Sequence, residues 1–375
     1  MNGGKEISFE PVHFFEDYDL FGELRIVQKQ LDNIKEINLS CIKSLSVDDY
    51  ADYYFEVYDS QRVISTHDSY IRVWNTNTAK VLADFNTDEE GHNCLIDMQI
   101  KMLNNQLLAL KCDKKIKLWD MLTNKFIQTL YNADDNQELS PSCLELSKAG
   151  HLLVGINNGH IKMFNVNAPF ECLVDFKANE DGAQVTCIKT LPISGKQLTS
   201  SSDDNKIKLW SNLDDLQIKC MKTFECQVSD NEDEYEHYYD EEVEKNVIAL
   251  ELIPNNKNRF LSYINGVSVN LWDLETGLCI KSIKCIPIPG RFHCPKFKLI
   301  ESRFLICEQG NYEDFFELKI LDLGKEANEL TLLNTIEYEL NRILDIKVLP
   351  NCNLMISYEN LAKIFKVEYI LNEEI

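Results

Sequence analysis

The sequence predicts an all-β fold, and three observations lead to it. Seven short segments with strand-like alternation each end on a bulky residue followed by a polar one; the bulky residues, here called anchors, are Trp74, Trp119, Phe164, Trp210, Trp272, Leu321 and Phe365. The anchors follow one another at intervals of 45, 45, 46, 62, 49 and 44 residues. Turn residues such as Asn157, Asn158 and Gly159 separate the short strands. Together these features predict a seven-bladed β-propeller of four-stranded antiparallel blades.

Each repeat divides into four strands, called a to d from the centre of the ring outward. In the second repeat they read MQIKML, QLLALKC, KIKLWD and KFIQTL, and in the third SCLELS, HLLVGI, HIKMFN and ECLVDF. The fourth and fifth repeats divide in the same way. Alternating strands of this length are typical of sheets that are buried on both faces once the blades pack together.

Closure of the ring needs a fourth strand for the last repeat, which has only RILDIKV, NLMISY and LAKIFKV as strands a to c. An unpaired outer strand would be prone to pair with other chains. We predict that Leu24–Gln30 supplies this strand d, so that the N-terminal strand closes the ring and SCIKSL is strand a of the first blade. The alternative is that Glu368–Leu371 fills the position. Residues 1–20 are then an N-terminal extension, and residues 21–375 form one propeller.

The IKLWD-type endings, the Gly91-His92 dipeptide and the interval resemble the WD-repeat β-propeller family over roughly residues 22–370. The resemblance implies a hydrogen-bonded chain of a His, a strand b hydroxyl, an Asp in the b–c turn and the strand c Trp. The matching positions are Thr66, Asp68 and Trp74; His92, Lys111 in place of the hydroxyl, Asp113 and Trp119; Asn158 and Phe164; Ser202, Asp204 and Trp210; and Phe315 at the turn of the sixth repeat. Their recurrence indicates a structural role, because a catalytic group is needed once.

Composition restricts the classes of partner. Lys and Arg number 38 against 61 Asp and Glu, which gives a net charge of −23 and argues against binding to nucleic acid or an anionic membrane. No apolar run is long enough to span a bilayer, and the N-terminus does not have the build of a signal peptide. Thirteen cysteines without paired spacing indicate a reducing compartment. We therefore expect a cytoplasmic or nuclear protein, or one in a host cytosol if it is a secreted bacterial effector.

The strongest departure from the repeat is an acidic insertion at Val228–Glu244, between strand d of the fourth repeat and strand a of the fifth. It accounts for the 62-residue interval and contains three tyrosines among nine acidic residues. Carboxylates can hold a basic partner while tyrosines supply contact area. The predicted partner-binding residues are Glu232, Asp233, Glu234, Tyr235, Glu236, Tyr238, Tyr239, Asp240, Glu241 and Glu242. A solvated charge run and a modification site are the alternatives.

Three further features have simpler explanations. Asp48–Asp59 reads as an enlarged a–b hairpin of the first blade or a second contact surface. Ile286–Gly290 followed by Arg291, Phe292 and His293 reads as a stiff linker. Cys41, Cys143 and Cys187 fall at similar strand a positions, where a small residue suits a crowded layer.

We expect a non-enzymatic protein-interaction scaffold, monomeric, whose rigid ring presents loops to a basic protein or peptide. No clustered Cys or His, Gly-rich phosphate loop or nucleophile elbow occurs, so we expect no metal, no cofactor and no catalytic residues. One alternative is a substrate-recruiting adaptor or host-directed bacterial effector acting through the first twenty residues or Asn372–Ile375. The other is an enzyme that uses the propeller channel as a pocket.

Overall fold

The computed structural model describes most of the chain. The described residues are 34–46, 54–67, 70–86, 99–112, 114–133, 139–147, 149–191, 198–202, 204–211, 218–226, 246–254, 256–264, 268–284, 297–310, 316–324, 327–337, 343–358 and 361–371. Their regular structure consists of antiparallel strands. No helix in these ranges is long and apolar enough to cross a membrane. The predicted all-β propeller with four-stranded antiparallel blades is confirmed.

The described strands form seven four-stranded sheets, numbered here as blades 1 to 7 in chain order. Blades 1 to 3 comprise β2 (Tyr54–Val57), β3 (Arg62–His67), β4 (Tyr70–Asn75) and β5 (Lys80–Asn86); β6 (Gln99–Met102), β7 (Leu107–Cys112), β8 (Lys115–Asp120) and β9 (Lys125–Asn132); and β10 (Pro141–Leu146), β11 (His151–Ile156), β12 (His160–Asn165) and β13 (Cys172–Lys177).

Blades 4 to 7 follow the same order, except that the last one takes its outer strand from the start of the chain. They comprise β14 (Val185–Thr190), β15 (Leu198–Ser202), β16 (Lys206–Ser211) and β17 (Lys219–Glu225); β18 (Val247–Leu252), β19 (Arg259–Ile264), β20 (Ser268–Asp273) and β21 (Cys279–Lys284); β22 (Phe297–Ile300), β23 (Phe304–Gly310), β24 (Phe316–Asp322) and β25 (Thr331–Glu337); and β26 (Ile343–Val348), β27 (Leu354–Tyr358), β28 (Leu361–Leu371) and β1 (Ile34–Ser46).

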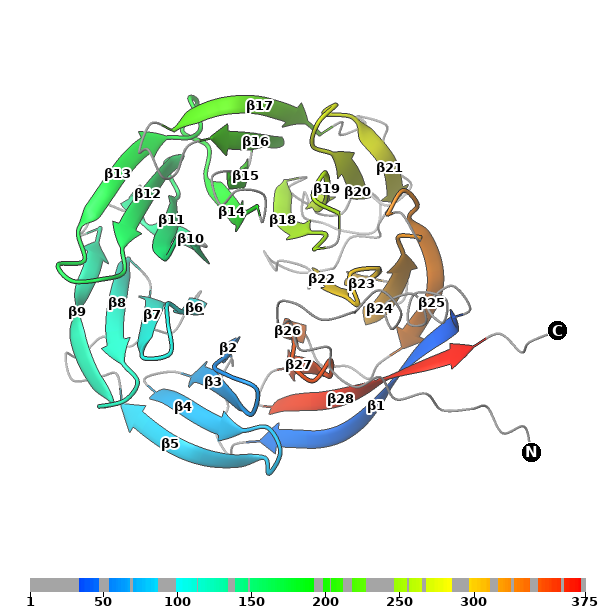
Figure 1. The fold of residues 1–375 in the computed structure, drawn as a ribbon, viewed down its shortest axis with the longest axis horizontal. Coiled ribbons are helices and arrows are strands. Elements are labelled where there is room, and N and C mark those ends of the chain that lie inside the picture. Colours follow the sequence, from blue (N-terminus) through cyan, green and yellow to red (C-terminus); the bar gives the residue numbers. More distant parts are fainter. Residues whose placement is uncertain are drawn as a thin grey trace, which may run out of the picture.

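The sheets stand around a common centre (Figure 1). Strand a of each blade, which is β2, β6, β10, β14, β18, β22 or β26, lies nearest that centre, and strand d lies at the rim. Hydrophobic clusters join neighbouring sheets: one contains Ile64 and Ile71 of blade 1 together with Leu108 and Trp119 of blade 2. No sheet buries both of its faces alone, so the interior of the protein lies between the blades.

Burial along the strands explains their sequence pattern. In strand c of blade 2, the four residues from Ile116 to Trp119 are all buried, whereas strand d of the same blade alternates between exposed and half-buried residues. The middle strands have a neighbouring sheet on each face, and the rim strands are only partly covered. Apolar runs therefore identify strands b, such as Leu107–Leu110, whereas strand c is buried although it contains Lys117. A polar-apolar alternation with exposed polar residues identifies strand d.

Closure by an N-terminal strand is observed, but by a different segment from the one predicted. β1 pairs with β28 over eleven residue pairs, from Ile34 with Leu371 to Ser46 with Leu361. The predicted closing segment, Leu24–Gln30, lies outside the described residues. Glu368–Leu371 forms the end of β28 and so extends strand c rather than replacing strand d.

This pairing corrects two assignments in the first blade. SCIKSL belongs to β1 at the rim, and strand a of blade 1 is β2, which contains Phe55 and Glu56. Asp48–Asp59 is therefore not an enlarged a–b hairpin, because its second half contains β2 itself and the a–b turn is short. The error arose because SCIKSL has the alternation of a strand a, and alternation alone does not say which strand it pairs with.

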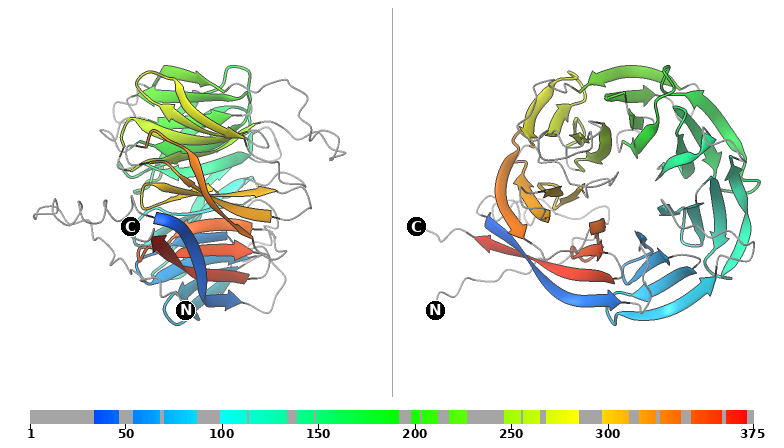
Figure 2. Two further views of the ribbon diagram at one scale, coloured as in Figure 1. Left: turned by 90° about the vertical axis from the view of Figure 1, so that its right-hand side faces the viewer. Right: turned by 180° about the vertical axis from the view of Figure 1, so that it is seen from behind.

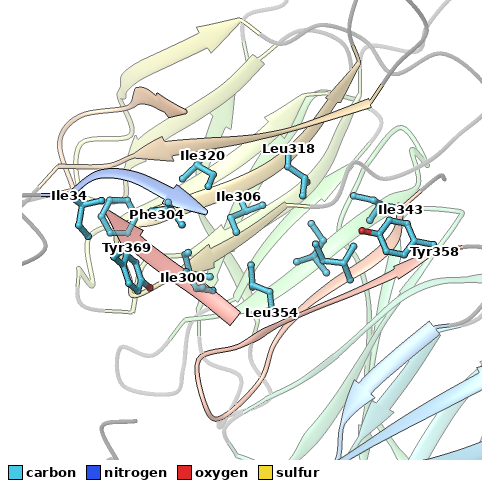
Figure 3. Packing of buried hydrophobic residues seen from close by; sticks show 14 residues of the cluster. Ile34, Ile300, Phe304, Ile306, Leu318, Ile320, Ile343, Leu354, Tyr358 and Tyr369 are labelled. Atoms are coloured by element: carbon cyan, nitrogen blue, oxygen red, sulfur yellow. The ribbon is translucent and has the colours of Figure 1, made fainter. Parts of the chain in front are cut away.

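β1 and β28 continue beyond blade 7 as a two-stranded ribbon that lies against blade 6 (Figures 1 and 2). Ile34, Ile37 and Tyr369 of the ribbon pack with Phe304 and Ile320 of blade 6 in one hydrophobic cluster (Figure 3). The side chain of Asn334 on β25 accepts a hydrogen bond from the Ile37 N–H at 3.2 Å and donates one to the Ile37 carbonyl at 3.0 Å. β1 and β28 thus join blade 7 to blade 6.

Candidate functional site at the centre of the ring

The predicted partner-binding residues Glu232 to Glu242 lie outside the described residues, as do Ile286–Gly290 and His293. The strands on either side of the acidic insertion are described: β17 ends at Glu225 and β18 begins at Val247. The insertion therefore joins the rim of blade 4 to the centre of blade 5, as predicted from the spacing. Its binding role stays a prediction.

Among the described side chains, blades 1 and 5 show the hydrogen-bonded tryptophan that the family resemblance implies. The indole N–H of Trp74 donates to the hydroxyl of Ser65 at 2.8 Å, and that of Trp272 donates to Ser262 at 2.9 Å. The predicted hydroxyl in blade 1 was Thr66, and this was wrong by one residue. Trp74 lies opposite Val63, so the strand b residue on the same side of the sheet is Ser65, two positions further on.

The same register accounts for the missing bond in blade 2. Trp119 lies opposite Leu108, which places Leu110 rather than the predicted Lys111 at the hydroxyl position. The Trp119 indole N–H accordingly has no hydrogen-bond partner in the described structure. Asp68, His92, Asp113 and Phe315 lie outside the described residues.

Two predicted turn residues do act on the backbone. Asp204 Oδ1 accepts a hydrogen bond from the Lys206 N–H at 3.1 Å, and Asn158 Oδ1 accepts one from the His160 N–H at 3.3 Å. Both residues stabilise the b–c turn two positions before strand c begins. Asn158 therefore replaces the expected Asp in blade 3, as predicted, and these groups serve the fold.

The centre of the ring carries a set of charged residues that the sequence reasoning missed. Each strand a has a charged residue that pairs with the strand b residue immediately after the one opposite the anchor. These seven residues, here called the charge collar, are Glu56, Lys101, Glu145, Lys189, Glu251, Lys298 and Lys347. They occupy equivalent positions in the seven blades, and their charge alternates along the chain from Glu56 to Lys298.

Ion pairs across the blade boundaries connect the first half of the collar. Lys101 of blade 2 lies between Glu56 of blade 1 and Glu145 of blade 3. Its Nζ is 3.9 Å from the Glu56 carboxylate and 3.5 Å from the Glu145 carboxylate. Lys347 of blade 7 reaches Glu56 of blade 1 at 3.4 Å, so this pair spans the junction between the last and the first blade. These side chains are only 14–28% exposed.

The second half of the collar centres on Glu251 of blade 5. Lys298 of blade 6 donates to its Oε1 at 2.7 Å, and Lys189 of blade 4 lies 3.8 Å from its Oε2. Its side chain is only 10% exposed. Burial by itself would raise the pKa of the Glu251 carboxyl, but the charges of Lys298 and Lys189 outweigh burial and lower it.

The lysines shift in the matching direction. Burial by itself would lower the pKa of Lys189, but Glu251 and Glu145 raise it; for Lys347 the charges of Asp345 and Glu56 do the same. Both lysines are therefore protonated and Glu251 is ionised at neutral pH. Groups held in one charge state by their neighbours are poorly suited to proton transfer near pH 7. The collar can join blades electrostatically, and its chemistry does not indicate catalysis.

The described ranges contain no group of three or more His, Cys, Asp or Glu side chains that could hold a metal ion. Of the three cysteines predicted to be equivalent, Cys143 and Cys187 lie on the strands a of blades 3 and 4, whereas Cys41 is exposed on β1 at the rim. The prediction for Cys41 was wrong for the same reason as for SCIKSL. Burial raises the pKa of the Cys143 thiol, which is therefore unreactive.

A signal for the collar was present in the sequence. Each strand a contains a charged residue with an uncharged residue on each side, as in FEV, IKM, LEL and IKT, and the sign of the charge alternates over the first six repeats. Aligning the repeats on their anchors would have revealed it. A single strand does not reveal it, because an isolated Lys in a strand is usually explained by a solvated head group.

A comparison with protein families identifies residues 170–211 as a WD domain, G-beta repeat. This range begins at β13, the rim strand of blade 3, and ends at β16, strand c of blade 4. The sequence repeat thus contains strand d of one sheet and strands a to c of the next. Residues 170–211 are therefore a WD repeat within this β-propeller. Together with the ring of four-stranded sheets, the match over these 42 residues supports a WD-repeat β-propeller.

Among curated proteins, the chain is similar to a CCR4-associated factor 4 homolog from Vanderwaltozyma polyspora, with 22% identity over 269 residues. The similarity covers 70% of this chain but 33% of the relative. The chain therefore spans about a third of the length of the curated relative that it matches. WD-repeat propellers are commonly protein-interaction scaffolds, and typically not enzymes.

Proposed function

We propose that this WD-repeat propeller is a non-enzymatic scaffold in which the acidic segment Val228–Glu244 binds a basic protein or peptide. In this proposal residues 21–375 form one closed seven-bladed ring, monomeric, with residues 1–20 as an extension. The observation that carries the proposal is where the acidic residues lie: many of them are in the connections from strand d of one blade to strand a of the next. The segment joins two strands that are fixed in neighbouring blades, so it starts and ends at rigid positions, and a site anchored in this way loses less entropy on binding.

Other connections of the same class are also acidic. Because each blade has four antiparallel strands, every connection from strand d to the next strand a begins and ends on the same side of the ring. The seven connections are 47–53, 87–98, 133–140, 178–184, 226–246, 285–296 and 338–342, and together they contain 22 Asp and Glu but four Lys and Arg. Opposite charge steers a basic partner toward such a side and raises the rate of association.

The charges of the described residues also support the proposal. The described residues contain 28 Lys and Arg and 23 Asp and Glu, so their net charge is +5. The chain as a whole has a net charge of −23. The acidity therefore belongs to the remaining segments, and a general need for solubility would not by itself concentrate it in connections of one class.

The similarity to a CCR4-associated factor supports a role in a protein complex, because that relative is named for its association with another protein. We propose that this chain likewise works as a member of a complex, in the cytoplasm or nucleus. The partner and the complex of this chain are to be found by experiment, since the similarity covers a third of the relative.

The proposal is tested by affinity purification from native cells followed by measurement of the recovered partner's affinity at increasing salt. In the test variant, the nine acidic residues of Val228–Glu244 become Asn or Gln and the tyrosines stay. The matched control variant neutralises Asp88, Glu89 and Glu90 in another d–a connection. We expect the test variant to lose binding and salt dependence while the control keeps most of both. Equal affinity of the test variant and the wild type would refute the proposed site.

A second variant separates the two parts of the site. Replacing Tyr235, Tyr238 and Tyr239 by Ser leaves the charge unchanged but removes the aromatic contact area. We expect this variant to keep the salt dependence of binding and to lose affinity mainly through faster dissociation. A loss of salt dependence instead would show that the tyrosines act by shaping the acidic segment.

A further inference from the structure

The collar has an odd number of positions, and this creates an electrostatic problem. Alternating charges can close into a ring without conflict only when the number of positions is even. Going round the blades in order, the collar reads Glu56, Lys101, Glu145, Lys189, Glu251, Lys298 and Lys347. Each junction between neighbouring blades joins opposite charges except the one between Lys298 of blade 6 and Lys347 of blade 7. Such a junction is unfavourable because like charges repel in a partly buried site, and Lys189 of blade 4 adds to the positive charge around Lys347.

Blade 7 carries an additional acidic residue at this junction. Asp345 lies two residues before Lys347 on β26, and its Oδ2 is 3.2 Å from the Lys347 Nζ. The residues at the same position in the other described strands a are Tyr54, Gln99, Cys143, Cys187 and Ala249. None of them is acidic. With Asp345, the four lysines face four carboxylates and the collar is neutral.

We infer that Asp345 is the residue that allows a seven-membered charge collar to close, by neutralising the junction between Lys298 and Lys347. Its position is fixed by its own backbone, since Oδ1 accepts a hydrogen bond from the Ile346 N–H at 2.8 Å. The other oxygen is then directed to Lys347. Lys298 forms an ion pair with Glu251 of blade 5, and Lys347 forms one with Glu56 of blade 1. Each lysine of the junction is therefore paired with the blade on the side away from the junction.

This role differs from that of an ordinary ion pair. If Asp345 only forms an ion pair with Lys347, then removing its charge affects that lysine alone. If it compensates the junction, its removal exposes Lys298 and Lys347 to each other, and neutralising either lysine relieves the repulsion. The two possibilities therefore make different predictions for Lys298, which has no direct ion pair with Asp345 among those of the described residues.

The test is a set of double-mutant cycles read by thermal unfolding at low and high salt. Asp345→Asn keeps the shape and the Oδ1 acceptor, and we expect it to lower Tm by about 3 °C at low salt. In the wild-type background, Lys298→Gln and Lys347→Gln each lower Tm, because Glu251 or Glu56 loses a partner. In the Asp345→Asn background, each should lower Tm by about 2 °C less, or raise it, and the difference should shrink in high salt.

The control cycle combines Lys298→Gln with Asp84→Asn, which removes a carboxylate paired with Arg72 at the rim. We expect these two effects to add. Additive effects of Lys298→Gln and Asp345→Asn would overturn the inference and reduce Asp345 to a partner of Lys347. If Asp345→Asn does not give folded protein, the same question is answered by yield: recovery of soluble protein with Lys298→Gln supports the inference, and no recovery contradicts it.

Discussion

The centre of the ring and the connections between its blades use the same residue types in opposite ways. In the collar, each glutamate lies within 4 Å of at least one lysine from a neighbouring blade, so that charge is neutralised pair by pair. In the d–a connections, acidic residues far outnumber basic ones. Charge at the centre therefore joins the blades, and we propose that charge in the connections is available to a partner. The net charge of a chain says little until it is divided between such regions.

Among the changes that test this comparison, the largest effect is expected from removing the charge of Glu251, the carboxylate that two collar lysines share. We expect Glu251→Gln to lower the free energy of unfolding by about 3 kcal/mol, because it leaves Lys189 and Lys298 close together without their shared partner. Chemical denaturation measures the change. Glu180→Gln, an exposed glutamate in the connection between blades 3 and 4, is the control and should change stability by less than about 0.5 kcal/mol.

The pH dependence of stability sharpens the same point. The pKa of Glu251 is lowered in the folded protein below its ordinary value of 4.5. Its contribution is therefore fully present above that value and is lost as the pH falls through the folded pKa. We expect the stability difference between the wild type and Glu251→Gln to be constant from pH 7 to about pH 5 and to shrink below pH 4.5. A difference that stays constant down to pH 3 would contradict the assigned ion pairs.

A neutral buried contact in the same blade gives a smaller effect for comparison. Ser262→Ala removes the acceptor for the Trp272 indole N–H, and we expect a loss of about 1–2 kcal/mol. In contrast to Glu251→Gln, the change should be insensitive to salt and to pH between 3 and 7. A matched variant in blade 2, Leu110→Ser, would offer Trp119 the acceptor that it lacks and tests whether the missing bond matters there.

Much of the fold could be predicted from the anchors, because a strand that recurs at a fixed interval is buried in the same way each time. The closing strand could not, since the alternation of SCIKSL fits β1 at the rim as well as a strand a, and pairing with β28 decides between them. Ser65 was missed in favour of Thr66 for a related reason. Which hydroxyl reaches Trp74 depends on the register of β3 against β4, and a shift of one residue points the side chain to the other face.

The candidate site was predictable to a smaller extent. The acidic insertion follows from one irregular interval, and its side chains lie outside the described residues. The collar was missed because its members are far apart in the sequence, as with Lys347 and Glu56, which lie 291 positions apart. Each is an ordinary strand residue on its own, and only the ring brings the strands a together.

The central claim is that the acidic connections bind while the neutral collar supports the ring. The most direct test measures both properties on one variant, the form of Val228–Glu244 with its nine acidic residues replaced by Asn or Gln. We predict an unfolding free energy within about 0.5 kcal/mol of the wild type, together with at least a tenfold loss of affinity for the recovered partner at low salt. Unchanged affinity, or an affinity loss that merely accompanies unfolding, would contradict the account.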